Sequence, residues 1–89
     1  MADPIRAAEL DRRVLLKDVN GRICDCFDSF VRDTEWYDLL CECGRLGCRE
    51  RVRVARGTYL EVRADPGRYV VVPGHASGAG DVVGEALAA

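Results

Sequence analysis

Three cysteines lie within eight residues of this sequence, and their type and spacing could bind a metal. Cys41 and Cys43 are separated by one residue, Cys48 follows after four more, and two glycines between them let the backbone fold around a common centre. His75 is the single histidine of the chain, and its imidazole could complete a four-coordinate structural zinc site. We therefore predict a Cys3His zinc site, whose ligands are Cys41, Cys43, Cys48 and His75.

Two further cysteines, Cys24 and Cys26, leave alternatives open. On a helix their side chains would point about 200° apart, so both could not face one ion. We interpret one of them as a small buried apolar residue and the other as partly exposed. Either could still replace His75 as the fourth ligand, and an iron–sulfur cluster could replace zinc as the inorganic centre.

The N-terminal third of the sequence predicts a long helix or a pair of helices. Asp3 could cap the helix, and Pro4 suits its first position. Apolar residues then recur at spacings near three to five, and they are Ile5, Leu10, Val14, Val19, Ile23, Phe27 and Phe30. The pair Asn20-Gly21 could interrupt this stripe, because glycine inside a helix costs about 1 kcal/mol relative to alanine.

The cysteine cluster is predicted to lie at the tip of a β-hairpin. Residues 36–42 are rich in aromatic and aliphatic side chains, and residues 51–54 alternate polar and apolar side chains as a half-buried strand does. A metal would close this hairpin at its loop. Glu42 and Glu50 flank the loop, and we interpret them as solvated charges rather than catalytic bases.

A short helix is expected over residues 57–64. Thr58 and Glu61 have the spacing of a capping box, in which a hydroxyl and a carboxylate bind two free amides at the helix start. The side chains expected to point inward are Tyr59, Leu60 and Val62.

The remaining residues predict one more strand and a tail. Residues 68–72 are apolar and β-branched, which favours a buried strand that could bring His75 to the hairpin. Residues 76–89 have the composition of a flexible tail, and residues 81–87 could form a short helix or fray. The sequence therefore predicts an α+β fold in a single zinc-binding domain that spans residues 1–89.

Composition narrows the function classes. The chain has 89 residues, which is near the lower limit at which burial alone stabilises a domain. Thirteen basic and fifteen acidic residues give a net charge of -2, so no nucleic-acid-binding excess of positive charge is present. No apolar run is long enough to cross a membrane, and we expect a cytoplasmic protein, where cysteines stay reduced.

Three motifs carry a resemblance to known proteins. They are the C-x-C-G-x3-C knuckle of residues 41–48, the V-R-x-D-P sequence of residues 62–66 and the P-G-H sequence of residues 73–75. In this order they resemble a family of small, largely uncharacterised actinobacterial proteins. Residues 18–23 are similar to the V-N-E-R-I helix of that family, which implies one continuous helix.

The resemblance also implies a ligand set and a C-terminal element. The shared ligands would be Cys41, Cys43, Cys48 and His75. The cysteines outside that set would be Cys24 and Cys26. The resemblance further implies a strand near the C-terminus, where the glycine- and alanine-rich composition leaves the element open.

A four-ligand zinc site predicts a structural role. Four protein ligands leave no position for a catalytic water, so we do not expect an enzyme. We expect an accessory or regulatory module that binds a protein partner, for which a long amphipathic helix offers a docking surface. The alternatives are a redox- or metal-sensing zinc-thiolate regulator and, third, a zinc-finger nucleic-acid binder.

Overall fold

The computed structural model describes residues 4–31 and 34–87 of the chain. The elements in chain order are α1 (Pro4–Asp28), β1 (Trp36–Leu40), β2 (Arg51–Ala55), α2 (Arg56–Ala64), β3 (Tyr69–Val71), β4 (Asp81–Val83) and β5 (Glu85–Ala86). This order confirms the predicted α+β class, with a long N-terminal helix, a hairpin, a second helix and further strands. The proposed helix cap, Asp3, lies outside the described residues.

The strands form two small sheets. β1, β2 and β5 make an antiparallel sheet in that order, while β3 and β4 pair in parallel. In the hairpin Tyr37 lies opposite Val54 and Leu39 opposite Val52, and all four side chains are buried. This alternation follows from the two-residue period of a strand and confirms the half-buried strand predicted over residues 51–54.

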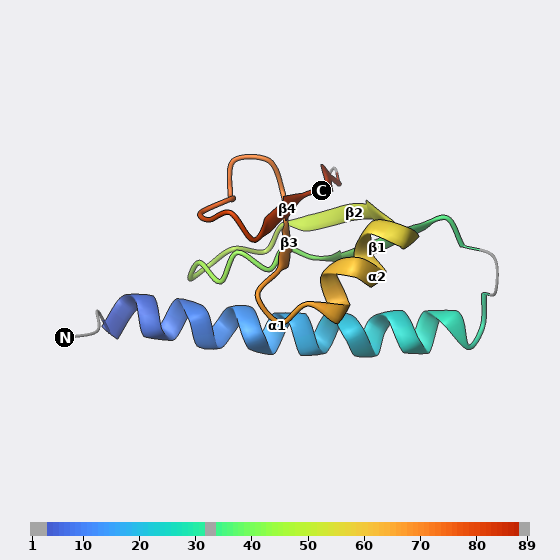
Figure 1. Cartoon of the computed structure of the whole chain (residues 1–89), viewed down its shortest axis with the longest axis horizontal. Coiled ribbons are helices and arrows are strands. Elements are labelled where there is room, and N and C mark those ends of the chain that lie inside the picture. Colours follow the sequence, from blue (N-terminus) through green and yellow to red (C-terminus); the bar gives the residue numbers. More distant parts are fainter. Residues whose placement is uncertain (1–3, 32–33, 88–89) are drawn as a thin grey trace.

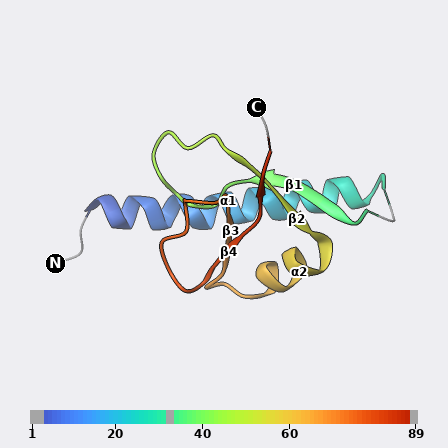
Figure 2. The same ribbon diagram turned by 90° about the horizontal axis from the view of Figure 1, so that it is seen from above.

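Helix α1 runs along one side of the molecule. In Figure 1 the strands and α2 all lie on the same side of α1, and in Figure 2 β1 and β2 cross over it. Its 25 residues correspond to a length of about 37 Å, and its N-terminal turns extend past the strands (Figure 1). No helix within the described residues is both long enough and apolar enough to cross a membrane.

The pair Asn20-Gly21 does not interrupt α1. The Asn20 side chain is fully buried, and its amide binds both the C=O and the N–H of Leu40, each at 2.9 Å. It therefore pairs with the end of β1 as a neighbouring strand would. A Cβ at Gly21 would lie 3.4 Å from the Arg63 guanidinium, which is an ordinary van der Waals contact, so the packing of α2 beside α1 does not require glycine here.

The polar side of α1 faces the rest of the protein. Lys17 Nζ donates to the Val62 carbonyl at 2.8 Å and also to the carbonyls of Asp65 and Arg68. Arg13 Nε donates to the Glu42 carbonyl at 3.0 Å. By contrast, many apolar side chains of the helix are exposed, and these are Leu10, Val14, Leu15, Ile23 and Phe27.

The start of α2 differs from its prediction. The N-cap is Ala55, with no side-chain hydrogen bond, and Thr58 lies within the helix, so the proposed capping box is wrong. Tyr59 and Val62 are buried as expected, whereas Leu60 is exposed. The helix begins early because β2 leads into it without a loop.

The helix suggested for residues 81–87 is also wrong. Asp81–Val83 pairs with β3 as β4, and Glu85–Ala86 pairs with β2 as β5. Valines at two of these positions favour a strand, and Gly84 allows a close approach, because a Cβ there would lie 2.5 Å from a Val52 methyl group. Much of the segment predicted as a flexible tail therefore takes part in the sheets.

Candidate metal centre

The four predicted ligands come together at one end of the hairpin. Cys41 follows β1, Cys43 and Cys48 lie in the knuckle (residues 41–48), and His75 lies in the connection between β3 and β4. The four ligand atoms all lie within 4.8 Å of one another. The two cysteines outside the set behave as interpreted from the sequence, since Cys24 is buried and Cys26 is exposed.

Two sulfur–nitrogen distances in the set fit a tetrahedral ion. His75 Nδ1 lies 3.7 Å from Cys41 Sγ and 3.5 Å from Cys48 Sγ. Metal distances of about 2.3 Å to sulfur and 2.0–2.1 Å to nitrogen, at tetrahedral angles, place sulfur and nitrogen about 3.5–3.6 Å apart. The set could therefore hold a metal ion with small adjustments of the side chains.

Backbone pairing explains how His75 reaches the knuckle. The Cys41 N–H donates to the Glu50 carbonyl at 3.0 Å, which continues the hairpin past its last strand residues. The Glu42 N–H donates to the Val70 carbonyl at 2.7 Å, so β3 lies beside the knuckle. A turn closed by the His75 N–H and the Val72 carbonyl, at 3.1 Å, then places the imidazole over the cysteines.

The sulfur atoms accept hydrogen bonds from the backbone. The Val72 N–H donates to Cys41 Sγ at 3.4 Å, and the Arg45 N–H donates to Cys43 Sγ at 3.5 Å. Such donors favour thiolates. Burial acts in the opposite direction, because it raises the pKa of Cys41 to about 12 and also raises the pKa of Cys48. A bound cation would supply the missing stabilisation of the charged sulfurs.

Glu42 is the residue of this region that sequence reasoning placed wrongly. It is fully buried rather than solvated, and its carboxylate accepts from the Val70 N–H at 3.0 Å and from Asn20 Nδ2 at 2.8 Å. Burial raises the pKa of Glu42, although both hydrogen bonds and the charges of Lys17 and Arg13 act to lower it. The sequence analysis interpreted the Asn20-Gly21 pair only as a possible break in the helix, so it did not predict this network.

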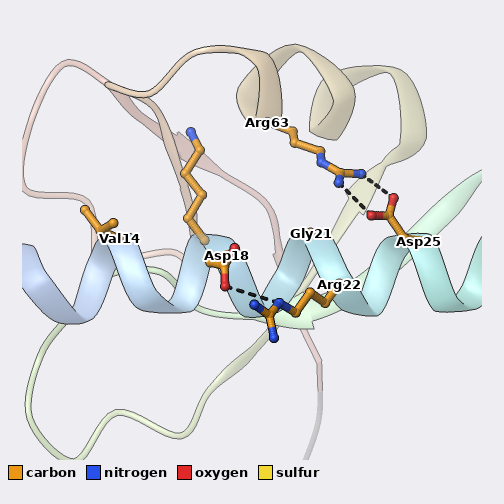
Figure 3. A pocket seen from close by; sticks show the side chains of 7 residues that line it. Val14, Asp18, Gly21, Arg22, Asp25 and Arg63 are labelled. Atoms are coloured by element: carbon orange, nitrogen blue, oxygen red, sulfur yellow. Dashed lines mark hydrogen bonds and ion pairs between the residues drawn. The ribbon is translucent and has the colours of Figure 1, made fainter.

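A groove of about 370 Å³ lies between α1 and α2, and Figure 3 shows its charged side chains. Arg63 reaches from α2 to Asp25 of α1 with two bonds of 2.7 and 2.9 Å, and the guanidinium lowers the pKa of Asp25. Arg22 and Asp18 form a second pair at 3.3 Å. The Arg63–Asp25 pair therefore links the two helices across the groove, whereas the Arg22–Asp18 pair lies within α1.

Comparison with protein-family models, with curated proteins and with solved structures finds no match to this chain. The functional argument therefore rests on the residues and their geometry.

The knuckle also depends on a close approach to α1, which we expect substitution of Gly44 to reveal. Gly44 has φ +77, and a Cβ there would overlap the Glu9 carbonyl oxygen and lie 2.5 Å from Arg13 Cγ. Gly44→Ala should therefore lower the free energy of unfolding by about 3 kcal/mol, from backbone strain plus overpacking. Urea denaturation of the metal-loaded protein measures this loss.

Gly47→Ala is the matched control for this prediction. Gly47 has a similar φ of +82, but a Cβ there would meet nothing within 4 Å, so only backbone strain of about 1 kcal/mol is expected. Equal losses in the two variants would contradict a close contact between the knuckle and α1.

Proposed function

We propose that this chain is a small zinc-binding domain in which a Cys3His ion is structural, and that it acts as an accessory or regulatory protein-binding module. The observation that carries the proposal is the convergence of three sulfurs and one imidazole nitrogen within 4.8 Å. Zinc suits this donor set, because it binds thiolate and imidazole and is four-coordinate and tetrahedral in structural sites.

The positions of the ligands support a structural role over a catalytic one. Four protein ligands leave no coordination position for water or substrate. The ion would instead join three parts of the fold, namely the end of β1, the knuckle and the turn after β3. The reduced thiols that such a site needs favour the cytoplasm. Membership of the actinobacterial family is part of the same proposal, since its shared ligands are these four residues.

An uncovered apolar surface supports the protein-binding part. Near the C-terminal end of α1, an apolar hollow of about 410 Å³ is lined by Ile23, Cys26, Phe27, Phe30 and Val31. Exposed aromatic and aliphatic side chains grouped in this way mark interaction surfaces. We therefore assign partner binding to α1.

A redox or metal sensor is the second candidate. Cys48 and His75 are only half-buried, so oxidants could reach one side of the site. Oxidation of a zinc-bound thiolate would release the ion and with it the cross-link between the knuckle and β3. Reversible zinc release at low doses of peroxide would favour this candidate, whereas zinc that stays bound favours the structural role.

Metal analysis of the purified protein tests the zinc site. We expect one zinc ion per chain in the wild type and a colourless protein. His75→Ala should weaken zinc binding by more than the roughly 10–100-fold that loss of an outer-shell partner costs, because it removes a direct ligand. Cys24→Ala, which lies outside the set, should leave the zinc affinity unchanged.

Two results would overturn the assignment. A brown protein that absorbs visible light would identify an iron–sulfur centre. Unchanged zinc affinity in His75→Ala, with loss of affinity in Cys24→Ala, would transfer the fourth ligand to Cys24.

A further inference from the structure

We infer that Arg13 of α1 positions the fourth metal ligand, because its guanidinium joins the knuckle to the segment that carries His75. Arg13 is not a ligand itself, and it acts through the segments that it holds together. The inference deepens the metal part of the proposed function and rests on that part. It makes the affinity for the ion depend on α1, which contributes none of the four ligands.

All three guanidinium nitrogens of Arg13 donate hydrogen bonds, and their acceptors lie on two different segments of the site. Nε donates to the Glu42 carbonyl in the knuckle at 3.0 Å. Nη1 donates to Ser77 Oγ at 3.3 Å, and Nη2 donates to the Asp81 carboxylate. Ser77 and Asp81 follow His75 by two and six positions. One side chain therefore connects the cysteine loop to the connection between β3 and β4.

Asp81 extends this clamp to the backbone beside His75. Its second carboxylate oxygen accepts from the Ser77 N–H at 2.7 Å and from Ser77 Oγ at 3.3 Å. The side chains of Arg13 and Asp81 are only 14 % and 2 % exposed, so water is largely excluded from the ion pair. Desolvation offsets much of the attraction in such a pair, and its net gain in stability is small. We therefore attribute to it the relative position of the two segments.

Arg13 also contacts the chain ahead of His75. Its Cζ lies 4.2 Å from the ring centroid of Tyr69, the first residue of β3. The aliphatic part of the side chain packs on the knuckle, since a Cβ at Gly44 would lie 2.5 Å from Arg13 Cγ. The segment that carries the imidazole is thus held by Arg13 both before and after the ligand.

The connection between β3 and β4 has few side chains of its own that could fix the imidazole. Residues 73–80 include three glycines and two alanines, and six of the eight residues are exposed. Glycine-rich backbone has much conformational freedom to lose. Without the clamp His75 would occupy the ligand position for a smaller fraction of the time, and the affinity for the ion falls in proportion to that fraction.

The geometry of the guanidinium matters more than its charge. A divalent ion with three thiolates carries a net negative charge, which any nearby cation would stabilise. The charge of Arg13 is already paired with that of Asp81. Lysine keeps the charge but lacks the planar fork that serves several acceptors at once, so Arg13→Lys should not restore the function of arginine.

Zinc affinity of the full chain, measured by competition with a chelator, is the first test. Arg13→Gln should weaken zinc binding by about 10–100-fold, as expected for loss of a residue that orients a ligand, and Arg13→Lys should lose nearly as much. Arg12→Gln is the matched control, because it removes the same charge from an exposed position on the same helix and should bind zinc as the wild type does. Wild-type affinity in Arg13→Gln overturns the inference, and wild-type affinity in Arg13→Lys overturns the geometric role.

Hydrogen exchange of the zinc-loaded protein separates positioning from a general loss of stability. The N–H groups of His75 and Asp81 bind the Val72 and Gly78 carbonyls, each at 3.1 Å, and they report local opening of the connection. Arg13→Gln should speed their exchange about 10–100-fold, in line with the loss of zinc affinity.

Val62→Ala is the control for stability alone. Val62 is buried in α2, which carries no ligand, so its substitution destabilises the fold without touching the clamp. Exchange at His75 and Asp81 should then stay as in the wild type. If Arg13→Gln lowered the zinc affinity but left exchange at these two amides unchanged, Arg13 would act through the stability of the fold, and the inference would be overturned.

The role of Arg13 and the zinc site fail separately. A wild type that binds zinc, with unchanged affinity in Arg13→Gln, overturns the positioning role and leaves the zinc site intact. A wild type that binds no zinc overturns the proposed zinc domain and this inference with it.

Discussion

Replacing Cys41 by alanine is expected to abolish metal binding and to leave a largely unfolded chain at room temperature. Cys41 is buried at the end of β1, and its sulfur faces His75 at 3.7 Å. Structural zinc in finger peptides contributes about 10–16 kcal/mol of apparent binding free energy, whereas a whole domain has a net stability of about 5–15 kcal/mol. In a chain of 89 residues such a metal would therefore decide between the folded and unfolded states.

Circular dichroism and metal analysis of the same sample measure this effect. Cys24→Ala is the matched control, because Cys24 is equally buried but lies outside the ligand set. It should lose only about 1–2 kcal/mol of stability, the cost of removing one small buried group, and it should keep its metal. Treatment of the wild type with a chelator should reproduce the behaviour of Cys41→Ala.

A Cys41→Ala chain that stays folded and cooperative without metal would contradict the structural role. In that case the sheets and α1 would stabilise the domain alone, and the Cys3His set would need another purpose. The sensor candidate would then gain support, because a site that a protein can empty without unfolding is suited to regulated release.

Sequence reasoning located the Cys3His cluster because few residue types bind transition metals. Cys41, Cys43 and Cys48 are close in sequence, and the chain contains no histidine besides His75, so chemistry limited the choices. The carrier strand was also predictable, since Val70 and its β-branched neighbours favour a buried strand. These features depend on local sequence.

The C-terminal strands depend on distant partners, and local sequence did not predict them. β4 and β5 have three and two residues, and neither would be stable without β3 and β2 beside it. Similarly, the buried carboxylate of Glu42 is stabilised by Val70 and Asn20, which are 28 and 22 residues away in sequence. The formation of β4 and β5 and the burial of Glu42 therefore both depend on contacts between residues that are far apart in sequence.

The orientation of α1 was equally inaccessible from periodicity. Its apolar stripe was visible in the sequence, but an amphipathic helix normally turns that stripe toward its own core. Here polar contacts turn the other side inward, since Arg13 and Lys17 bind backbone carbonyls and Asn20 binds the end of β1. Several apolar side chains of the helix, among them Leu15, Ile23 and Phe27, consequently stay exposed.

We expect Asn20→Ala to show how strongly α1 depends on these polar contacts. The substitution removes the bonds to both backbone groups of Leu40 and the bond of 2.8 Å to the Glu42 carboxylate. Buried polar groups without a partner cost about 1–3 kcal/mol each, and more when charged, so the free energy of unfolding should fall by about 4 kcal/mol. Urea denaturation at a fixed zinc concentration measures it.

Asp18→Ala provides the control on the same helix. Asp18 forms an exposed pair with Arg22 at 3.3 Å, and exposed pairs within a helix contribute only about 0.3–0.5 kcal/mol. If Asn20→Ala were no more costly than Asp18→Ala, α1 could not be attached through Asn20, and the apolar stripe would have to be its docking face within the chain. A large loss with zinc still bound would instead show that a buried amide, rather than the apolar stripe, fixes the helix and thereby leaves the stripe free for a partner.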